Sequence, residues 1–387
     1  MIDILNKLYE SSGLFSFFGP DGWKYLVMIV IAIALLYLAI FKEFEPYLLV
    51  PIGFAMLLVN IPGTNLFVKE TIIDNGQEIN KYTGLFGYLY YGVSFGIYPS
   101  LIFLGIGATT DFGPLLARPK SMLLGAAAQI GIFITFLGAI LFNFTGPEAA
   151  SIGIIGGADG PTAILLSSQL APHLLGAISI AAYSYMALVP IIQPPLVKTF
   201  TTKKERMIEM KQLREVSKKE KILFPLIVAV ITITLIPSSA MIIGMLMLGN
   251  LIKESGVVPN LISASGKTIL YTVTILLGIS IGATTQATNF LKAETLVIIG
   301  LGLFAFIVAT IFGILGAKVM NFFSKEKINP IIGAAGVSAV PMAARVAMKE
   351  GKLANPNNYL LMHAMGPNVA GVIGSAIAAG LLLSYFS

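Results

Sequence analysis

The chain contains no cysteine, which excludes disulfides, thiol nucleophiles and cysteine-based metal sites. It has only two histidines, so a histidine-rich metal centre is excluded as well. Only 11% of the 387 residues are charged, whereas soluble proteins average about 25%. The sequence also lacks a Gly-x-x-x-x-Gly-Lys-Ser/Thr phosphate loop, a biotin-attachment loop and a convincing Ser-His-Asp set. These absences argue against a soluble enzyme, an ATPase of the phosphate-loop type and a serine hydrolase.

Apolar residues, in contrast, make up 56% of the chain. This composition predicts an all-α polytopic membrane protein, because apolar helices satisfy their own backbone groups in lipid. The net charge of +6 does not indicate a nucleic-acid partner in such a chain, since basic residues of membrane proteins mark cytoplasmic loops. His173 and His363 are expected to be packing or interfacial residues rather than proton carriers.

Apolar runs long enough to cross about 30 Å of hydrocarbon recur along the sequence. The predicted spans are 24–42, 46–61, 84–106, 121–144, 172–196, 222–236, 238–252, 268–283, 294–317 and 357–385. Two further apolar segments, 150–170 and 328–346, are interrupted by glycine and proline. We expect these two to form re-entrant hairpins or discontinuous helices. Residues 4–18 are expected to form an amphipathic segment at the membrane interface.

A basic segment divides the chain. Residues 197–221 hold nine lysines and arginines against four glutamates, which places this short loop in the cytoplasm. The predicted organisation is an interfacial N-terminal segment, a first transmembrane repeat, a basic cytoplasmic linker and a second, inverted transmembrane repeat, at residues 1–23, 24–196, 197–221 and 222–387.

Counting spans outward from the linker places the other basic loops inside and the 60–83 loop outside. The basic residues expected inside are Arg118, Lys120, Lys318, Lys325, Lys327, Lys349 and Lys352. The count closes only if the two interrupted segments do not fully cross, and it then places both termini outside.

The two halves repeat each other. LGIGATT at 104–110 matches ISIGATT at 279–285, and IIGGA at 154–158 matches IIGAA at 331–335. The offsets of 175 and 177 residues are nearly equal. A weaker match pairs GFAML at 53–57 with GMLML at 244–248. With five spans per half, the second copy would enter from the opposite side, and sites in such inverted repeats lie where the broken helices of the two copies meet.

The motif GGADGPTAI at 156–164 places a carboxylate between glycines and a proline in the middle of an apolar region. Glycine and proline both interrupt a helix, and broken backbone persists at membrane depth only inside protein or beside a watery cavity. An acid at that depth is by default a functional-site hypothesis. Asp159 is therefore predicted to sit at a helix break in an ion pathway, although it would also serve as the N-cap of a half-helix.

Sodium prefers oxygen ligands, and both broken segments supply them. The candidates are the carbonyls around Gly156 and Gly157, together with Asn329, Gly333, Ser338, Asn368, Tyr183 and Tyr185. The last span is expected to break at 366–368, beside Asn368. Structural alternatives remain: Asn329 as a helix cap, Asn368 as a bond between helices, and the threonines at 109, 110, 284 and 285 bonded to their own helices. Asp111 and Arg118 are expected to be solvated loop residues.

Three motifs carry a resemblance that covers essentially the whole chain. They are GGADGPTAI at 156–164, NPIIGAAGVSAVP at 329–341 and LMHAMGPNVAG at 361–371. They resemble the β subunits of the sodium-pumping biotin-dependent decarboxylases, a family that includes the oxaloacetate, methylmalonyl-CoA, glutaconyl-CoA and malonate enzymes.

The resemblance implies a membrane enzyme subunit in the inner (plasma) membrane of a bacterium or archaeon. In this family a carboxyltransferase α subunit moves a carboxyl group from the substrate to biotin on a carrier protein. The β subunit decarboxylates the carboxybiotin, consumes a proton from outside and exports sodium. The implied partners are the α subunit, the biotin carrier and a small γ or δ membrane subunit in an oligomeric complex; biotin is not attached to this chain.

By motif match, the family's catalytic residues fall on Asp159, Ser338 and Tyr185. Its sodium ligands fall on these three residues and on Asn368 and Asn329, and carboxybiotin is expected near Asn329 and Gly333. In the resulting hypothesis, one sodium ion binds near Asp159 and Asn368 and a second near Ser338 and Tyr185, while the broken-helix core shifts against its scaffold.

Two alternatives remain open from the sequence. The first is a stand-alone sodium-coupled organic-anion transporter, which would work without a biotin protein. The second is a non-catalytic membrane anchor, in which Asp159→Asn would leave sodium flux and decarboxylation intact.

Overall fold

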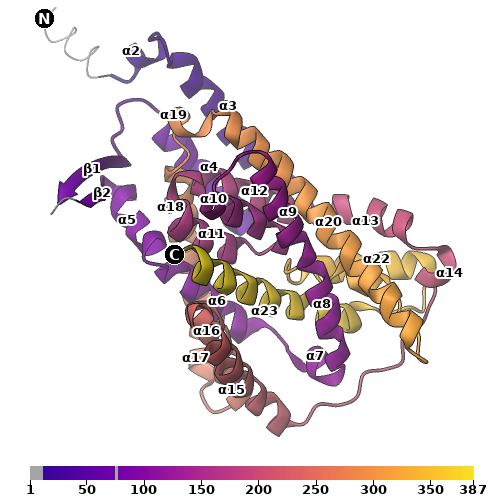
Figure 1. Ribbon diagram of the computed structural model, residues 1–387. Coiled ribbons are helices and arrows are strands. Elements are labelled where there is room, and N and C mark those ends of the chain that lie inside the picture. Colours follow the sequence, from indigo (N-terminus) through magenta and orange to yellow (C-terminus); the bar gives the residue numbers. More distant parts are fainter. Residues whose placement is uncertain (1–11, 75–76) are drawn as a thin grey trace, which may run out of the picture.

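The computed structural model describes residues 12–74 and 77–387, and this part of the chain is mainly helical (Figure 1). Five of the described helices are long and apolar enough to cross a membrane, or seven if two bent helix pairs each form one span. The prediction of a helical polytopic membrane protein is confirmed, whereas a total of ten crossings is not. The expected amphipathic segment at 4–18 lies partly outside the described residues.

The first half of the described chain is helical except for one hairpin. Its elements are α2 (Leu14–Phe17), α3 (Gly22–Phe41), α4 (Pro46–Val59), β1 (Val68–Asp74), β2 (Gln77–Thr83), α5 (Leu85–Ser94), α6 (Ile97–Thr109), α7 (Gly113–Ala117), η1 (Pro119–Ser121), α8 (Met122–Ala128), α9 (Ile130–Leu141), α10 (Gly146–Gly153), η2 (Ile154–Gly157), α11 (Gly160–Leu170), η3 (Pro172–Leu174), α12 (Leu175–Ala187) and α13 (Val189–Phe200).

The second half is helical throughout its regular elements. They are α14 (Lys203–Arg206), α15 (Lys218–Leu235), η4 (Pro237–Ser239), α16 (Ala240–Ser255), α17 (Pro259–Ser263), η5 (Ala264–Ile269), α18 (Leu270–Ala283), α19 (Ala287–Phe290), α20 (Ala293–Phe323), α21 (Ile331–Ala334), α22 (Met342–Ala354) and α23 (Leu361–Phe386).

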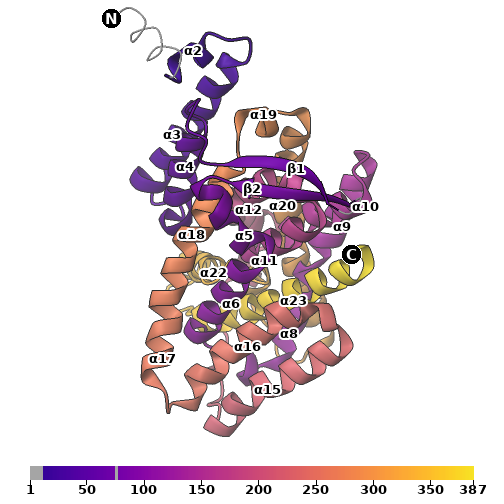
Figure 2. The same ribbon diagram turned by 90° about the vertical axis from the view of Figure 1, so that its left-hand side faces the viewer.

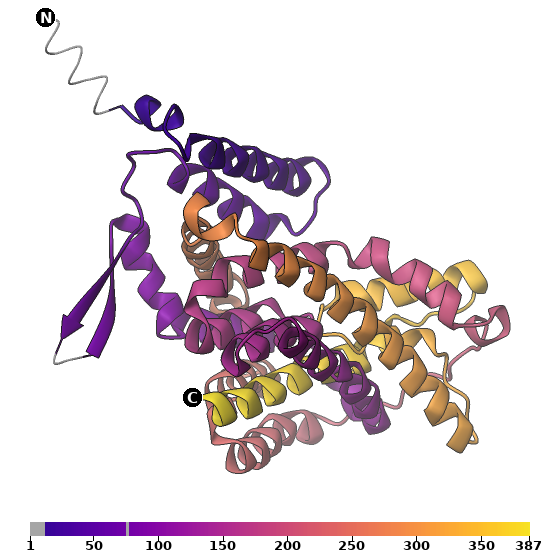
Figure 3. The ribbon, with the colours of Figure 1, turned by 45° about the horizontal axis from the view of Figure 1, so that its top comes forward.

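Helices α3 and α4 lie side by side as an antiparallel pair (Figure 3). Helix α3 is long because, Lys24 apart, its residues are apolar or aromatic, and it contains no glycine or proline after the first position. Pro46 occupies the first turn of α4, where its missing N–H costs no hydrogen bond. With 14 residues, α4 is about 21 Å long, which is too short to cross the hydrocarbon alone.

The loop expected outside, at 60–83, contains structure that the sequence prediction missed. Strands β1 and β2 pair antiparallel, with Val68 opposite Thr83. The hairpin lies at the same end of the molecule as α2 and α19 (Figure 2). The all-α description therefore holds for the helical body but not for this two-stranded projection.

Two predicted spans are bent rather than straight. Helices α5 and α6 meet at 63°, next to Gly96, whose φ of 70° is a left-handed conformation that suits glycine. Helices α12 and α13 also meet at 63°, at Leu188, just before a proline in the first turn of α13. The predicted spans 84–106 and 172–196 therefore each correspond to one of these bent helix pairs.

The helices that carry the Gly-Ala-Thr-Thr motif pack closely on partners from the other half of the chain. A Cβ on Gly107 of α6 would lie 2.0 Å from the carbonyl oxygen of Leu246 in α16. A Cβ on Gly282 of α18 would lie 2.4 Å from the carbonyl oxygen of Ile52 in α4. Small residues thus let both helix pairs approach at backbone distance, as in other membrane helix interfaces.

Both segments predicted to be interrupted are interrupted. The first breaks between η2 and α11, where Ala158 adopts φ 54°, and the second runs without regular structure from Ala335 to Pro341 between α21 and α22. The break expected at 366–368 is wrong, because α23 continues through Pro367. A proline inside a helix removes one backbone hydrogen bond but need not end the helix when surrounding helices support it.

The basic linker crosses the ends of several helices on one side of the molecule. Within the linker, Arg214 donates to the carbonyl of Leu116 at the end of α7, and Glu205 pairs with Lys318 of α20 at 3.2 Å. On α13, Lys198 lies 3.8 Å from Glu350 of α22. The basic helix ends assigned to the cytoplasm thus gather around the linker, on the side opposite α2 and the β-hairpin (Figure 1).

Candidate functional site

The two interrupted segments meet inside the helical body. The backbone N–H of Ser338 donates a 2.9 Å hydrogen bond to the carbonyl of Gly157, so backbone freed at one break is satisfied at the other. Helix α23 passes the same point at close range, since a Cβ on Gly371 would lie 2.3 Å from the carbonyl of Gly336. The junction therefore consists of three chain segments at backbone contact.

Asp159 lies at this junction and is 4% exposed. It is the N-cap of α11, where its Oδ1 accepts from the backbone N–H of Thr162 at 3.3 Å. Its Oδ2 accepts from the hydroxyl of Ser375, on α23, at 2.7 Å. Among the described residues, no lysine, arginine or histidine lies within ion-pair distance of this carboxylate. Asp159 is thus both a helix cap and a buried acid without a basic partner.

The hydroxyls of Ser338 and Ser375 extend this contact across the junction. Their Oγ atoms lie 3.2 Å apart, and both side chains are buried. One residue from each interrupted segment and one from α23 therefore form a continuous polar chain, from Ser338 through Ser375 to Asp159.

Asn368 fixes the second interrupted segment to α23. Its amide nitrogen faces the carbonyls of Ala335, Val337 and Ala339 at 3.1, 2.6 and 3.4 Å. Its Oδ1 is buried and has no hydrogen-bond partner. The amide therefore anchors three freed carbonyls, while its own oxygen remains an unsatisfied acceptor.

Three other buried oxygens around the junction also lack a partner. They are Oε1 of Gln129, Oγ1 of Thr162 and the hydroxyl of Tyr183. A Cβ on Gly157 would lie 3.3 Å from Gln129 Oε1, and one on Gly160 would lie 2.7 Å from the Tyr183 hydroxyl. Buried acceptors are normally satisfied by a donor or an ion, so their concentration next to a carboxylate fits a hard cation with oxygen ligands.

A cavity of about 460 Å³ adjoins the junction. Its lining includes the buried Asp159 and Ser338 and, just after α6, Asp111, whose side chain is 43% exposed. Asp111 lies 3.9 Å from Lys221, which belongs to the basic linker. The cavity thus leads from Asp159 toward the side on which the basic residues gather.

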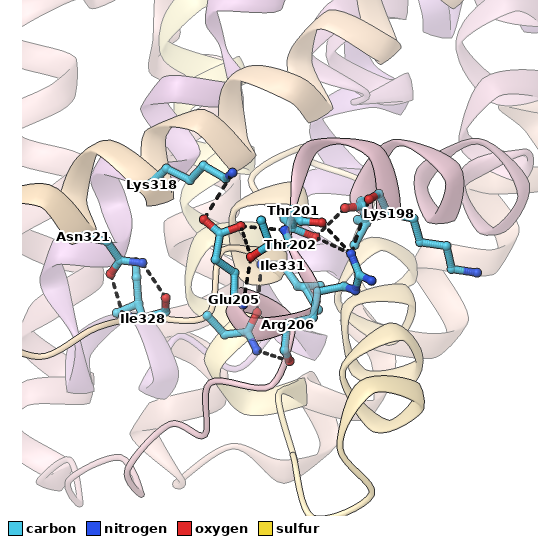
Figure 4. Close-up of polar contacts among 11 residues, drawn as sticks. Lys198, Thr201, Thr202, Glu205, Arg206, Lys318, Asn321, Ile328 and Ile331 are labelled. Carbon is cyan, nitrogen blue, oxygen red and sulfur yellow. Dashed lines mark hydrogen bonds and ion pairs between the residues drawn. The ribbon is translucent and has the colours of Figure 1, made fainter.

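The structure does not bring Asn329, Gly333 or Tyr185 to Asp159. Asn329 donates to the carbonyls of Arg206 and Ile208 at 2.8 and 2.9 Å, and its Oδ1 accepts from the backbone N–H of Ile331, the first residue of α21. Asn329 therefore contacts the linker. In the same part of the linker, Glu205 reaches Lys318 of α20 (Figure 4).

Gly333 lets the backbone of α21 approach α20 closely, because a Cβ added at this position would lie 2.1 Å from the carbonyl oxygen of Gly313 in α20. The Tyr185 hydroxyl donates to the carbonyl of Ile299, also in α20. Gly333 in α21 and Tyr185 in α12 thus contact α20 rather than Asp159. Of the threonines, 109, 284 and 285 bond to their own helices, as the structural alternative expected.

The sequence reasoning missed Ser375 and Gln129, which the structure brings to the junction. Ser375 follows Asn368 by seven residues, which is two helical turns and places both on one face of α23. Gln129 is the one amide in the apolar run 121–141, and polar residues in such runs are rare. The spacing in α23 and the lone amide in an apolar run would have identified Ser375 and Gln129. Whether Tyr183 or Tyr185 faces the junction depends on the rotation of α12, which the sequence does not show.

The fold and the site define a polytopic helical membrane protein with a buried carboxylate, surrounded by oxygen atoms, where two interrupted helical segments meet. A family model described as the Na+-transporting oxaloacetate decarboxylase beta subunit matches residues 24–386. The chain belongs to this family and is a membrane subunit of the sodium-transporting decarboxylase type.

Curated relatives from three enzymes of this type align along nearly their whole length. The chain is 55% identical to the methylmalonyl-CoA decarboxylase subunit beta of Propionigenium modestum, with 100% of both chains covered. It is 51% identical to the glutaconyl-CoA decarboxylase subunit beta of Acidaminococcus fermentans, with 98% of this chain and 97% of the relative covered. It is 49% identical to the oxaloacetate decarboxylase beta chain 2 of Salmonella typhi, with 99% of both covered.

Proposed function

We propose that this chain decarboxylates carboxybiotin on a partner carrier protein and couples the reaction to sodium export and proton uptake. The observation that carries the proposal is the buried carboxylate of Asp159, which has hydroxyl and backbone partners but no basic partner among the described residues. A buried carboxylate of this kind attracts a cation, and the unpartnered oxygens of Asn368 and Gln129 supply further ligands.

The sodium site proposed here consists of Asp159, Ser338, Ser375, Asn368 and Gln129. It keeps three of the residues expected from the family motifs and adds Ser375 and Gln129. Roles for Asn329, Gly333 and Tyr185 in sodium or carboxybiotin binding remain predictions, and their contacts with the linker and α20 support a positioning role. The inverted repeat also remains a proposal, supported by the packing of α6 on α16 and of α18 on α4.

The cavity beside Asp159 gives carboxybiotin a place within reach of the sodium site. In decarboxylation the bond between the ring nitrogen and the carboxyl carbon breaks, carbon dioxide leaves, and the nitrogen keeps the electron pair and takes a proton. Sodium and carboxybiotin must each favour one of two conformations for the reaction to move the ion. Because both ligands would bind at the same cavity, a conformational change there would affect sodium and carboxybiotin together.

The relatives are named as β subunits, which fits a multi-subunit decarboxylase. The proposed partners are a carboxyltransferase α subunit, a biotin carrier and a small γ or δ subunit, in a bacterial or archaeal plasma membrane. The acid that the complex decarboxylates is chosen by the α subunit, since this chain meets only carboxybiotin. The differences in identity among the relatives therefore do not assign a substrate.

The test measures decarboxylation of carboxybiotin by the purified protein with and without sodium. Wild type is expected to be stimulated by sodium, and Asp159→Asn is expected to lose the stimulation. Asp21→Asn is the matched control, because Asp21 is exposed and pairs with Lys24 outside the junction. Sodium-driven anion uptake into liposomes without any biotin protein would favour the stand-alone transporter, and full activity in Asp159→Asn would favour a membrane anchor.

A further inference from the structure

A second cavity, of about 440 Å³, lies away from the junction at the cytoplasmic ends of two membrane helices. Arg118 and Lys120, at the start of the span Pro119–Leu141, form one side of it. The last turns of α20 and the following residues, including Phe323 and Glu326, form the other. Neither the junction nor the cavity beside Asp159 shares a residue with it.

One wall of this cavity is apolar and exposed. Leu123 is 61% exposed, Val319 is 57% exposed and Phe323 is 82% exposed. All three belong to helices that are long and apolar enough to cross the membrane. Exposed apolar side chains at that depth face acyl chains rather than water. A small soluble anion has no apolar part that could pack on this wall, whereas the acyl chains of a phospholipid can.

The opposite wall is basic, and its arginine is partly exposed rather than fully solvated as the sequence suggested. The Arg118 backbone is fixed because its carbonyl accepts hydrogen bonds from both the N–H and the hydroxyl of Ser121. Its Nη1 is shielded from solvent and has no hydrogen-bond partner. A buried guanidinium nitrogen in this state needs an acceptor, and a phosphate oxygen is a good geometric match.

The one acid that lines the cavity does not cancel this attraction. Glu326 lies 2.8 Å from Lys211 of the linker, so its charge is already paired. Arg118 and Lys120 therefore leave a net positive wall beside an apolar one. Basic pockets between membrane helices on the cytoplasmic side are typical binding sites for anionic lipid headgroups.

We propose that this cavity, lined by Arg118, Lys120, Leu123, Val319 and Phe323, binds an anionic phospholipid of the cytoplasmic leaflet. The phosphate meets Arg118 and Lys120, and the acyl chains lie along the exposed side chains of α8 and α20. Because the linker reaches the rim through Lys211, the lipid stabilises the contact between linker and membrane helices.

The test is native mass spectrometry of the purified, delipidated protein titrated with phosphatidylglycerol or phosphatidylcholine. Wild type is expected to retain one phosphatidylglycerol molecule in preference to phosphatidylcholine. The double variant Arg118→Gln, Lys120→Gln is expected to bind it about 30-fold more weakly, from the attraction of two basic side chains to an anionic headgroup. Lys218→Gln, Lys219→Gln is the charge-matched control, since these lysines are exposed on the same side but outside the cavity.

The single variant Lys120→Gln keeps the test informative if the double variant does not fold, because the Lys120 side chain is exposed. It is expected to bind phosphatidylglycerol about fivefold more weakly. Equal retention of both lipids, or an equal loss in the control, would overturn the proposal. Binding of inorganic phosphate in place of the lipid would show a small-anion site, and loss of biotin-carrier binding without loss of lipid would show a protein-docking site.

Discussion

The hydroxyl of Ser375 donates a 2.7 Å hydrogen bond to Oδ2 of Asp159, although 216 residues separate the two along the chain. The contact joins α23 to the tip of the first interrupted segment. It brings an oxygen atom, rather than a basic group, to the buried acid. Among the described residues no basic side chain pairs with this acid, so its oxygen atoms are free to bind a cation, as the proposed sodium site requires.

Ser375→Ala is expected to weaken sodium activation without unfolding the protein. The variant removes a hydroxyl that contacts Asp159 and lies 3.2 Å from Ser338. Hydrogen bonds to charged groups contribute about 1.5–3 kcal/mol, so the sodium concentration for half-maximal decarboxylation should rise at least about tenfold. Ser167→Ala is the control, because that buried hydroxyl donates only within its own helix, to Ala163. A similar rise in both variants would show that packing, not coordination, is affected.

Asn368→Ala is expected to lower both thermal stability and sodium affinity. The variant leaves the carbonyls of Ala335 and Val337 without their side-chain donor, at a cost of about 1–3 kcal/mol for each buried group left unsatisfied. Thermal unfolding with and without sodium separates the two effects.

Asn60→Ala provides the comparison. Asn60 is equally buried and its amide joins Met56, Thr285 and Ala287 elsewhere in the protein. The Asn60→Ala variant should unfold at a lower temperature than wild type but should still be stabilised by sodium. Loss of that stabilisation in both variants would argue against a specific role for Asn368.

The sequence predicts the helix breaks well because their causes are local. Gly156, Gly157 and Pro161 lie in one short stretch, and their backbone preferences require no knowledge of the rest of the chain. The same local argument failed at Pro367, since neighbouring helices support α23 through that proline. Local composition also cannot show that a loop pairs into a β-hairpin, or that α5 and α6 meet at 63°.

The site was predicted in part, for the same reason. Asp159, Ser338 and Asn368 lie in or beside the predicted breaks, so the chemistry of the breaks pointed to them. Ser375 lies inside a regular helix, and only the rotation of α23 brings it to Asp159. Asn329 also lies beside a predicted break, but its amide nitrogen donates to a carbonyl of the linker instead of contacting Asp159. Contacts between segments far apart in sequence decide which polar residues meet.

Gly333→Ala is expected to destabilise the protein by about 1–3 kcal/mol, the usual effect of overpacking a tight interface. The new Cβ would lie 2.1 Å from the carbonyl oxygen of Gly313, and backbone there has no room to move without shifting α20. Gly300→Ala, in α20 itself, is the control, because a Cβ at Gly300 meets no atom within 4 Å. Thermal unfolding of both variants checks the difference, and equal midpoints would show that α20 tolerates a shift at Gly313.

Glu205→Gln is expected to loosen the linker at neutral pH but not in acid. Burial alone would raise the pKa of the Glu205 carboxyl, but hydrogen bonds from Thr202 and the charge of Lys318 outweigh it and lower the pKa below its ordinary value. A group whose pKa is lower in the folded state stabilises the fold above its unfolded pKa of about 4.3 and loses that effect as pH falls through the folded value.

The difference in thermal midpoint between wild type and Glu205→Gln should therefore be constant from about pH 8 to pH 5 and shrink below about pH 4. Glu326→Gln is the matched control, since Glu326 also pairs with a lysine but its side chain is 65% exposed and the pair is screened by solvent. It should change the midpoint much less at any pH. A Glu205 effect that grows on acidification, or that equals the Glu326 effect at neutral pH, would show that the carboxylate does not hold the linker to α20.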